Sequence, residues 1–328
     1  MVGGLTLGLM LAATTAPMAA SPEARPVSPD AKGVGHRYAP GLMSLLEQEI
    51  LSALDQRGLR GNMASWYRYA ASRLNATAGP YTGSEITGNC RLRWFDQMLR
   101  SPLKYPAESE QFTRELHEAM LSDHRGLEQA LITARAKLDA GSRKARKFAP
   151  VKSAADALDT VKQAMEAAQA GYAGALSTLT KREIQELWNN LYSVTTAQSQ
   201  IGHTLPDRYT ARRMCDLLEK IRRDRMLDAV DALVPLTDPE LLKQLGGVDA
   251  TRVEKLAGVE GSVVQQFVTP AGKVIVGGKG RNTYRLEELK DVAAVIDLGG
   301  DDTYQEGACN IERPLLVLID LAGNDVYQ

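Results

Sequence analysis

The sequence predicts an α+β protein, in which an N-terminal α-helical bundle is followed by a hairpin and the first coils of a parallel β-solenoid. Three observations carry this prediction. Apolar residues recur at three- and four-residue steps from Gly41 to about Leu245, as in amphipathic helices. The apolar pattern changes to that of strands after Gly258. The chain then repeats itself with a period of about 20 residues, which is typical of solenoid architectures.

Residues 1–20 predict a signal peptide. Leu5–Ala13 form an apolar run that is too short to span a bilayer as a helix. Small residues follow as far as Ala20, as a signal-peptidase site requires. No Lys or Arg precedes the run, which a start codon further upstream would explain, and a buried N-terminal helix is the alternative. Residues 21–40 carry four prolines and two glycines and predict a disordered tether.

Residues 41–245 form the predicted helical domain. A capped helix start is expected at Asp238, because this residue can cap and Pro239 suits the first helical position. Gly246 and Gly247 end that short helix. Several long helices joined by short loops predict an antiparallel bundle. The long helices are expected at about 109–139, 153–178, 181–200 and 207–234.

Residues 246–328 form the predicted strand-rich domain of a hairpin and solenoid repeats. The hairpin is expected where two apolar runs flank the turn Thr269–Gly272. Three segments that each end in a tyrosine then align with one another. We expect each tyrosine to pack against its copy in the next segment. The aligned segments are 275–284, 295–304 and 318–327.

The second and third aligned segments contain apolar strands followed by acidic turns. Val292–Ile296 and Leu315–Ile319 are near-continuous apolar runs, as in strands buried on both faces. Gly300 and Gly323 permit the left-handed backbone of a sharp turn. The polar residues of the turns and strand ends can cap backbone N–H groups or ligate a hard cation, and both interpretations stay open. These residues are Asp297, Asp301, Asp302, Asp320, Asn324 and Asp325.

The turns Gly300–Tyr304 and Gly323–Tyr327 resemble the hemolysin-type (RTX-like) calcium repeat, G-G-x-G-x-D-x-U-x. The resemblance implies a parallel β-roll with calcium between its coils, and the aspartate ligand of the family falls on Asp302 and Asp325. The first aligned segment has Asn282 at this position, so the resemblance implies no full site there. The family also packs two turn motifs into about 18 residues, whereas this chain has one per repeat.

The last 70 or so residues are more closely similar to uncharacterised bacterial secreted proteins. Those proteins carry tandem I-D-L-G-G-D-D-x-Y units behind a helical N-terminal region. This second resemblance implies a β-solenoid and an exported location, and it implies no established activity.

Composition and motifs narrow the function further. Lys and Arg number 39 and Asp and Glu 40, and this balance excludes a basic nucleic-acid coat. Three cysteines are too few for a disulfide scaffold, and a hydrophobic content of 44% is that of a globular protein. The sequence contains no P-loop, nucleophile elbow or complete G-x-G-x-x-G motif.

The sequence therefore predicts an exported, non-enzymatic structural or interaction protein whose solenoid turns bind calcium. Its expected location is periplasmic, cell-surface or extracellular, with a cell-envelope or extracellular polymer or protein as partner. We expect no nucleic-acid partner and no transmembrane segment in the mature chain. The alternative is a carbohydrate-active enzyme on a parallel β-helix that acts on an acidic polysaccharide, with Asp297, Asp320 and Arg313 on a coil face. Because no cap follows the third tyrosine, we expect the repeats to continue beyond Gln328.

Overall fold

The computed structural model describes residues 10–11, 42–73, 92–100, 102–121, 126–141, 143, 149–196, 208–307 and 309–328. Two compact units divide the chain, one formed by residues 17–139 and the other by residues 1–16 and 140–328. Of the predicted leader only Met10 and Leu11 belong to the described residues, and the predicted tether lies outside them. Among the helices of these ranges, none combines the length and the apolar character needed to cross a membrane.

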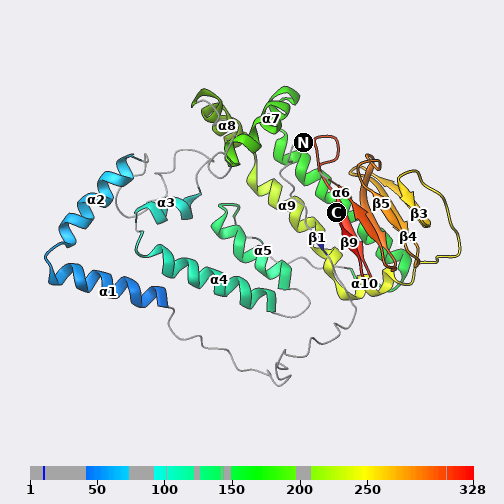
Figure 1. The fold of residues 1–328 in the computed structure, drawn as a ribbon, viewed down its shortest axis with the longest axis horizontal. Coiled ribbons are helices and arrows are strands. Elements are labelled where there is room, and N and C mark those ends of the chain that lie inside the picture. The colour runs from blue at the N-terminus through cyan, green and yellow to red at the C-terminus, as the bar shows by residue number, and fades with distance from the viewer. Residues whose placement is uncertain are drawn as a thin grey trace, which may run out of the picture. The chain divides into compact units, whose positions relative to one another are not determined.

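The unit of residues 17–139 contains helices α1 (Leu42–Gln56), α2 (Arg60–Arg73), α3 (Arg93–Arg100), α4 (Tyr105–Leu121) and α5 (Gly126–Lys137). The prediction of one helix over 109–139 is wrong, because α4 and α5 are separate helices that pack against each other (Figure 1). Gly126 begins α5 where the backbone of Met120 passes closely, so that a Cβ on Gly126 would lie 2.5 Å from the Met120 carbonyl oxygen.

The other unit begins with helices α6 (Ala154–Leu176), α7 (Lys181–Thr196), α8 (Arg208–Lys220), α9 (Arg223–Leu233) and α10 (Pro239–Leu245). A short 3₁₀ helix, Val234–Thr237, joins α9 to α10. The prediction of one helix over 207–234 is wrong. The chain leaves the helical conformation at Arg222 (φ −81°, ψ 92°), whose N–H donates to the carbonyl of Ala175 in α6. The predicted start of α10 is confirmed, because the side chain of Asp238 accepts from the N–H groups of Glu240 and Leu241.

Two mixed sheets follow these helices, so the protein is α+β (Figure 1). The first sheet has the strand order β1-β8-β6-β4-β3 and the second has the order β2-β5-β7-β9. The predicted hairpin is confirmed, since β3 and β4 pair in antiparallel fashion. The strands are β1 (Met10–Leu11), β2 (Val259–Glu260), β3 (Val263–Thr269), β4 (Gly272–Gly277), β5 (Thr283–Arg285), β6 (Val292–Asp297), β7 (Thr303–Gln305), β8 (Val317–Asp320) and β9 (Val326–Tyr327).

Each aligned segment of the sequence contributes one strand to each sheet. We call β4 with β5 repeat 1, β6 with β7 repeat 2, and β8 with β9 repeat 3. All pairings between successive repeats are parallel. The register places Tyr284 beside Tyr304 and Tyr304 beside Tyr327, with ring centroids 5.1 and 4.9 Å apart. The expected packing of each tyrosine on its copy is therefore confirmed.

Strand β6 is buried on both faces of the first sheet, as its apolar run predicts. Ile296 belongs to a core with Met165 of α6 and Leu241 of α10, whereas Val295 belongs to a core with Tyr284 and other residues of the second sheet. The order of layers is thus helices, first sheet, second sheet. Because α6 and α10 share a core with the first sheet, this compact unit begins well before residue 246, where the sequence predicts the strand-rich domain to start.

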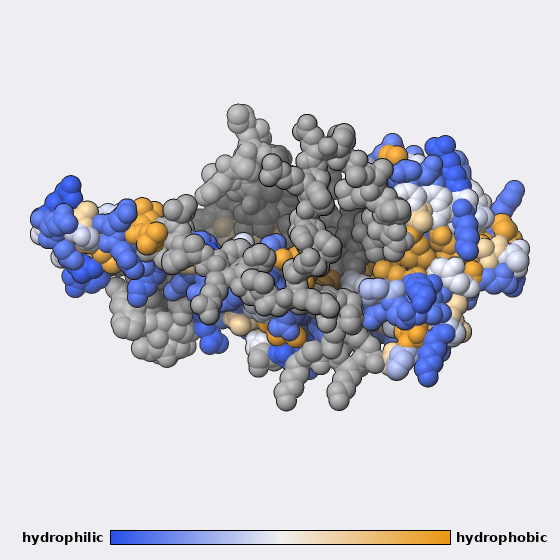
Figure 2. Space-filling model, turned by 90° about the horizontal axis from the view of Figure 1, so that it is seen from below, coloured by the Kyte–Doolittle hydropathy of each residue, from blue (hydrophilic) through white to orange (hydrophobic). Residues whose placement is uncertain are grey.

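On the face shown in Figure 2 the described residues are mainly hydrophilic, and hydrophobic residues come to the surface in separate patches. Large exposed apolar side chains include Trp66, Tyr69 and Val268. Scattered exposure of this kind is normal for a folded protein and does not by itself mark a binding surface.

Candidate metal centre

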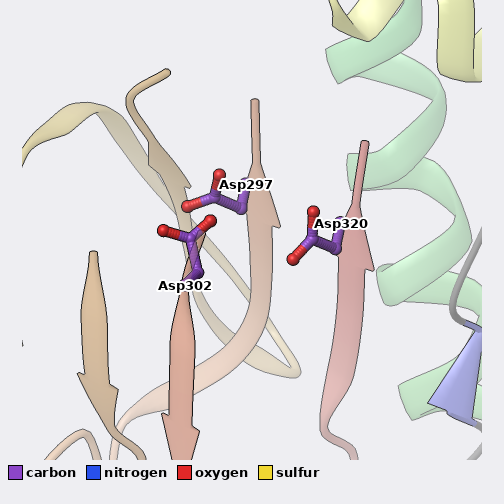
Figure 3. Close-up of side chains that lie close together, drawn as sticks. All are labelled: Asp297, Asp302 and Asp320. Atoms are coloured by element: carbon purple, nitrogen blue, oxygen red, sulfur yellow. The ribbon is translucent and has the colours of Figure 1, made fainter. Parts of the chain in front are cut away.

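Three buried aspartates converge between repeats 2 and 3. Asp297 ends β6, Asp320 ends β8, and Asp302 precedes β7. Their exposed fractions are 0%, 2% and 1%, and one carboxylate oxygen from each lies within 4.8 Å of the others. Figure 3 shows the carboxylates of Asp297 and Asp302 close together, with that of Asp320 directed toward them from the neighbouring strand. Because all three offer oxygen ligands, this aspartate triad could hold a metal ion.

The backbone occupies one oxygen of each carboxylate in the triad. Asp297 Oδ1 accepts from the N–H of Gly299 at 2.7 Å, and Asp320 Oδ1 accepts in the same way from Ala322 at 3.2 Å. Asp302 Oδ1 accepts from the N–H of Asn282 in repeat 1 at 2.6 Å. The turns therefore fix the orientation of the three carboxylates, and the Oδ2 atoms are left for other partners.

Side-chain donors reach two of the three Oδ2 atoms. Asp297 Oδ2 accepts from the hydroxyl of Tyr284 and from the amide of Asn282, the latter at 2.9 Å. Asp320 Oδ2 accepts from the hydroxyl of Tyr304 at 2.8 Å. These tyrosine and amide donors were not among the ligands predicted from the sequence. A constant spacing in the sequence could have linked the tyrosines to the aspartates, since Tyr304 follows Asp297 by seven residues and Tyr327 follows Asp320 by seven.

Asp302 Oδ2 is the exception among these oxygens. It is buried, and no described donor forms a hydrogen bond with it. A buried carboxylate oxygen without a partner is costly, because the protein returns none of the hydration that the oxygen loses. The Asp302 carboxyl also lies against that of Asp297, and either a proton shared between the two or a bound cation can offset their repulsion.

Burial and mutual repulsion both act on the protonation of the triad. Desolvation raises the pKa of Asp302 to about 7, and the charges of Asp297 and Asp325 add to this rise. Desolvation likewise raises the pKa of Asp320 to about 6 and raises the pKa of Asp297. Three carboxylates this close cannot all carry an uncompensated charge, so either protons or a cation must neutralise them.

The other predicted ligands lie outside the triad. Asp301 and Asn324 are exposed, and Asp301 Oδ1 accepts from the N–H of Asn324 at 3.0 Å. Asp325 Oδ1 accepts from the N–H of Asp302 at 2.9 Å. The same turns thus contain both kinds of residue. Asp301 and Asp325 cap backbone N–H groups, whereas the aspartate triad forms the buried cluster.

The turn glycines have the conformation that the sequence predicts. Gly300 and Gly323 have φ values of 145° and 152°. A Cβ on Gly323 would overlap the carbonyl oxygen of Gly300, and one on Gly300 would lie 2.7 Å from the carbonyl oxygen of Gly280. Glycine is therefore required here both for the backbone angle and for the close stacking of successive turns.

The residues of the enzyme alternative are buried rather than exposed on a face. Asp297 and Asp320 belong to the aspartate triad, and Arg313 is 3% exposed. The guanidinium of Arg313 donates to the carbonyl oxygens of Leu286 and Leu289 at 2.6 and 3.0 Å. These three side chains do not form a surface on which a polymer could lie.

Comparison with known proteins does not place the chain in a family. No protein-family model, no curated protein and no solved structure matches it. The functional assignment therefore depends on the site itself.

Proposed function

We propose that this chain is an exported, non-enzymatic structural or interaction protein whose repeats begin a β-solenoid and bind calcium between repeats 2 and 3. The observation that carries the proposal is the buried Asp302 Oδ2, which has no donor among the described residues and belongs to a carboxylate with an oxygen within 4.8 Å of those of Asp297 and Asp320. A bound cation supplies the positive charge that this cluster lacks.

The ligand chemistry favours calcium among the common cations. The triad offers carboxylate oxygens and neither thiolate nor imidazole, which selects a hard cation over zinc or copper. Magnesium gives up its water reluctantly and usually keeps several water ligands, whereas calcium accepts flexible oxygen coordination. A site between three carboxylates that are nearly inaccessible to solvent therefore suits calcium better.

Three features of the repeats support a solenoid. Successive repeats pair in parallel in both sheets, the tyrosines form one stack, and the turn glycines form a second column. Strand pairing within this set of repeats joins only successive ones, as in quasi-one-dimensional folds. A further repeat of the same kind would extend the second sheet beyond β9, whereas β1 occupies the edge of β8 in the first sheet.

The proposed mechanism couples the folding of the repeats to calcium. Without a cation the three carboxylates repel one another unless they take up protons, and this repulsion weakens the contact between repeats 2 and 3. Calcium binding stabilises the folded array because the unfolded chain has no preformed site. Extracellular modules work with weak calcium sites, so the array would become fully ordered after export and then present its surface to an envelope or extracellular partner.

Thermal unfolding of the full chain with and without calcium tests this proposal. The tyrosine stack provides a near-ultraviolet circular dichroism signal for the repeats. At a calcium concentration of 100 times the Kd, the free energy of unfolding is expected to rise by about 2.7 kcal/mol relative to the protein in EDTA. Magnesium at the same concentration is expected to have a smaller effect.

Two variants test whether the calcium effect depends on the triad or on the exposed charges of the turns. Asp320→Asn removes a charge of the triad and is expected to abolish the calcium effect. Asp301→Asn removes an exposed charge outside the triad and is expected to preserve it. If calcium changes neither the melting temperature nor the spectrum of the unaltered chain, the proposal is wrong.

A further inference from the structure

Two intervals between repeats can be compared atom by atom. The first interval lies between repeats 1 and 2, and the second lies between repeats 2 and 3. The register pairs Val276 with Ile296 and Ile296 with Ile319, so Gly277, Asp297 and Asp320 occupy equivalent strand ends. Asn282, Asp302 and Asp325 occupy equivalent turn positions, each one residue before a strand of the second sheet.

The turn side chains of the three repeats accept equivalent backbone hydrogen bonds. The N–H of Ser262 donates to Asn282 Oδ1 at 2.7 Å, and that of Asn282 donates to Asp302 Oδ1 at 2.6 Å. The N–H of Asp302 donates to Asp325 Oδ1 at 2.9 Å. Each turn side chain therefore accepts through Oδ1 from the N–H of the equivalent residue one turn earlier in the chain.

The tyrosine contacts of the two intervals are also equivalent. Tyr284 donates to Asp297 Oδ2 across the first interval, and Tyr304 donates to Asp320 Oδ2 across the second. The intervals differ in the second atom of the turn side chain. Asn282 Nδ2 donates to Asp297 Oδ2 at 2.9 Å, whereas its counterpart Asp302 Oδ2 is an acceptor that no donor reaches within the described part of the chain.

We propose that the amide of Asn282 occupies the role in the first interval that a bound cation fills in the second. The residue at this turn position then decides whether the strand-end carboxylate of the next repeat binds a protein donor or a metal ion. The three repeats accordingly take one cation, held by the aspartate triad. This inference rests on the proposed calcium site, and it names the residue that sets where the cation binds and how many are bound.

The strand end of repeat 1 agrees with this assignment. The first interval has Gly277 where the second has Asp297, so it carries one carboxylate instead of three. A side chain at position 277 would collide with the Tyr284 hydroxyl, and its Cβ would lie 2.5 Å from Asp297 Oδ2. The first interval is thus built without the charge that a cation would neutralise, and its remaining carboxylate already has two side-chain donors.

The exchange of Asn and Asp between the two positions tests the inference in the full chain. Bound calcium is counted by equilibrium dialysis, and thermal unfolding is measured in EDTA. Asp302→Asn is expected to bind no calcium and to melt in EDTA at least about 2–4 °C above the unaltered chain, because its amide can donate to Asp320. Asn282→Asp is expected to melt lower in EDTA, because it replaces the donor to Asp297 by a charge.

The outcomes distinguish this inference from the proposed function. If the unaltered chain binds no calcium, the proposed function and this inference both fail. If it binds calcium but Asp302→Asn still binds it, or melts no higher than the unaltered chain in EDTA, the inference is overturned and the calcium site stands. An Asn282→Asp variant that melts in EDTA like the unaltered chain also overturns the inference. This last test does not depend on whether Asp302→Asn folds.

Discussion

The hydroxyl of Tyr304 donates a hydrogen bond of 2.8 Å to Asp320, a residue of the following repeat. The ring of Tyr304 lies between those of Tyr284 and Tyr327, so the side chain both stacks with its copies and serves the aspartate triad. The stack and the acidic cluster are therefore one structure, and a change in the hydroxyl can be separated from a change in the ring.

The variant Tyr304→Phe separates the contribution of the hydroxyl from that of the ring. The variant keeps the ring stack and removes a donor from the buried Asp320, so we expect it to lower the free energy of unfolding by about 1–3 kcal/mol. The matched control is Tyr327→Phe, since that ring is 40% exposed at the edge of the stack and its hydroxyl is easily hydrated. Urea unfolding of both variants measures the difference, and equal losses would contradict the role of the Tyr304 hydroxyl.

The pH dependence of stability without divalent cations provides a second prediction. The pKa of Asp302 is raised to about 7 and that of Asp320 to about 6, from ordinary values near 4. Between pH 4 and 7 the folded chain therefore binds more protons than the unfolded chain, and stability contributed by the triad falls as the pH rises. In EDTA, unfolding at several pH values is expected to show this loss.

Other groups also titrate in this range, so the pH dependence of the unaltered chain is compared with that of a variant. Asp302→Asn lacks the carboxyl group with the larger raised pKa and is expected to show a flatter pH profile than the unaltered chain in EDTA. Calcium is expected to stabilise the unaltered chain more at pH 7.5 than at pH 5, because protons compete with the cation. A parallel loss of stability in both proteins from pH 5 to 7 would contradict the prediction.

The column of turn glycines gives a third prediction. Gly323→Ala places a side chain at φ 152° and against the carbonyl oxygen of Gly300, so we expect a loss of about 2 kcal/mol or more in the free energy of unfolding. Gly280→Ala is the control, because nothing lies within 4 Å of a Cβ at that position. Thermal unfolding distinguishes the two, and a Gly323→Ala variant as stable as the control would show that the turns can shift.

The start of α7 gives a fourth prediction, independent of the repeats. Glu183 accepts from Lys220 Nζ at 2.6 Å and from the backbone N–H of Thr180 at 2.9 Å, and the contact with Lys220 is the main cause that lowers its pKa to about 2. The stabilisation is present above the ordinary glutamate pKa and is lost as the pH falls through about 2. Glu183→Gln is expected to remove this acid-dependent part, as measured by unfolding between pH 5 and 2.

The control for that experiment is Glu166→Gln on α6, which is expected to leave the acid transition unchanged. If Glu183→Gln unfolds in acid like the unaltered chain, the pairing with Lys220 contributes nothing measurable. Such a result would be in keeping with the small energies of exposed ion pairs.

Local sequence patterns predicted much of the fold. The hairpin, the start of α10 at Asp238 and the tyrosine stack follow from turn chemistry, capping and repeat spacing, which act over a few residues. The long helices were harder, because the apolar period continues through Arg222, where only a tertiary hydrogen bond to Ala175 reveals the break. Periodicity alone cannot distinguish one long helix from two that pack side by side.

The sequence predicted which residues belong to the site but not how they are arranged in space. The spacing identified Asp297, Asp302 and Asp320 as candidates and grouped them with Asp301 and Asp325. Only the register between strands separates the buried members from the caps, and register depends on contacts across the chain. The departure at Asn282 was visible in the sequence, yet its meaning required the position of its amide beside Asp297.

The hydrogen bonds from tyrosine hydroxyls to the strand-end aspartates point one way along the array. The tyrosine hydroxyl and the turn N–H of one repeat donate to carboxylates of the next, from Asn282 to Asp302 and from Tyr304 to Asp320. A repeat that joins the array at the C-terminal side therefore brings its carboxylates to donors that are already in place. Assembly in the opposite order would bury those carboxylates before their donors arrive, which is costly. The buried strand-end carboxylates of repeats 2 and 3 therefore depend on donors from the repeat before them.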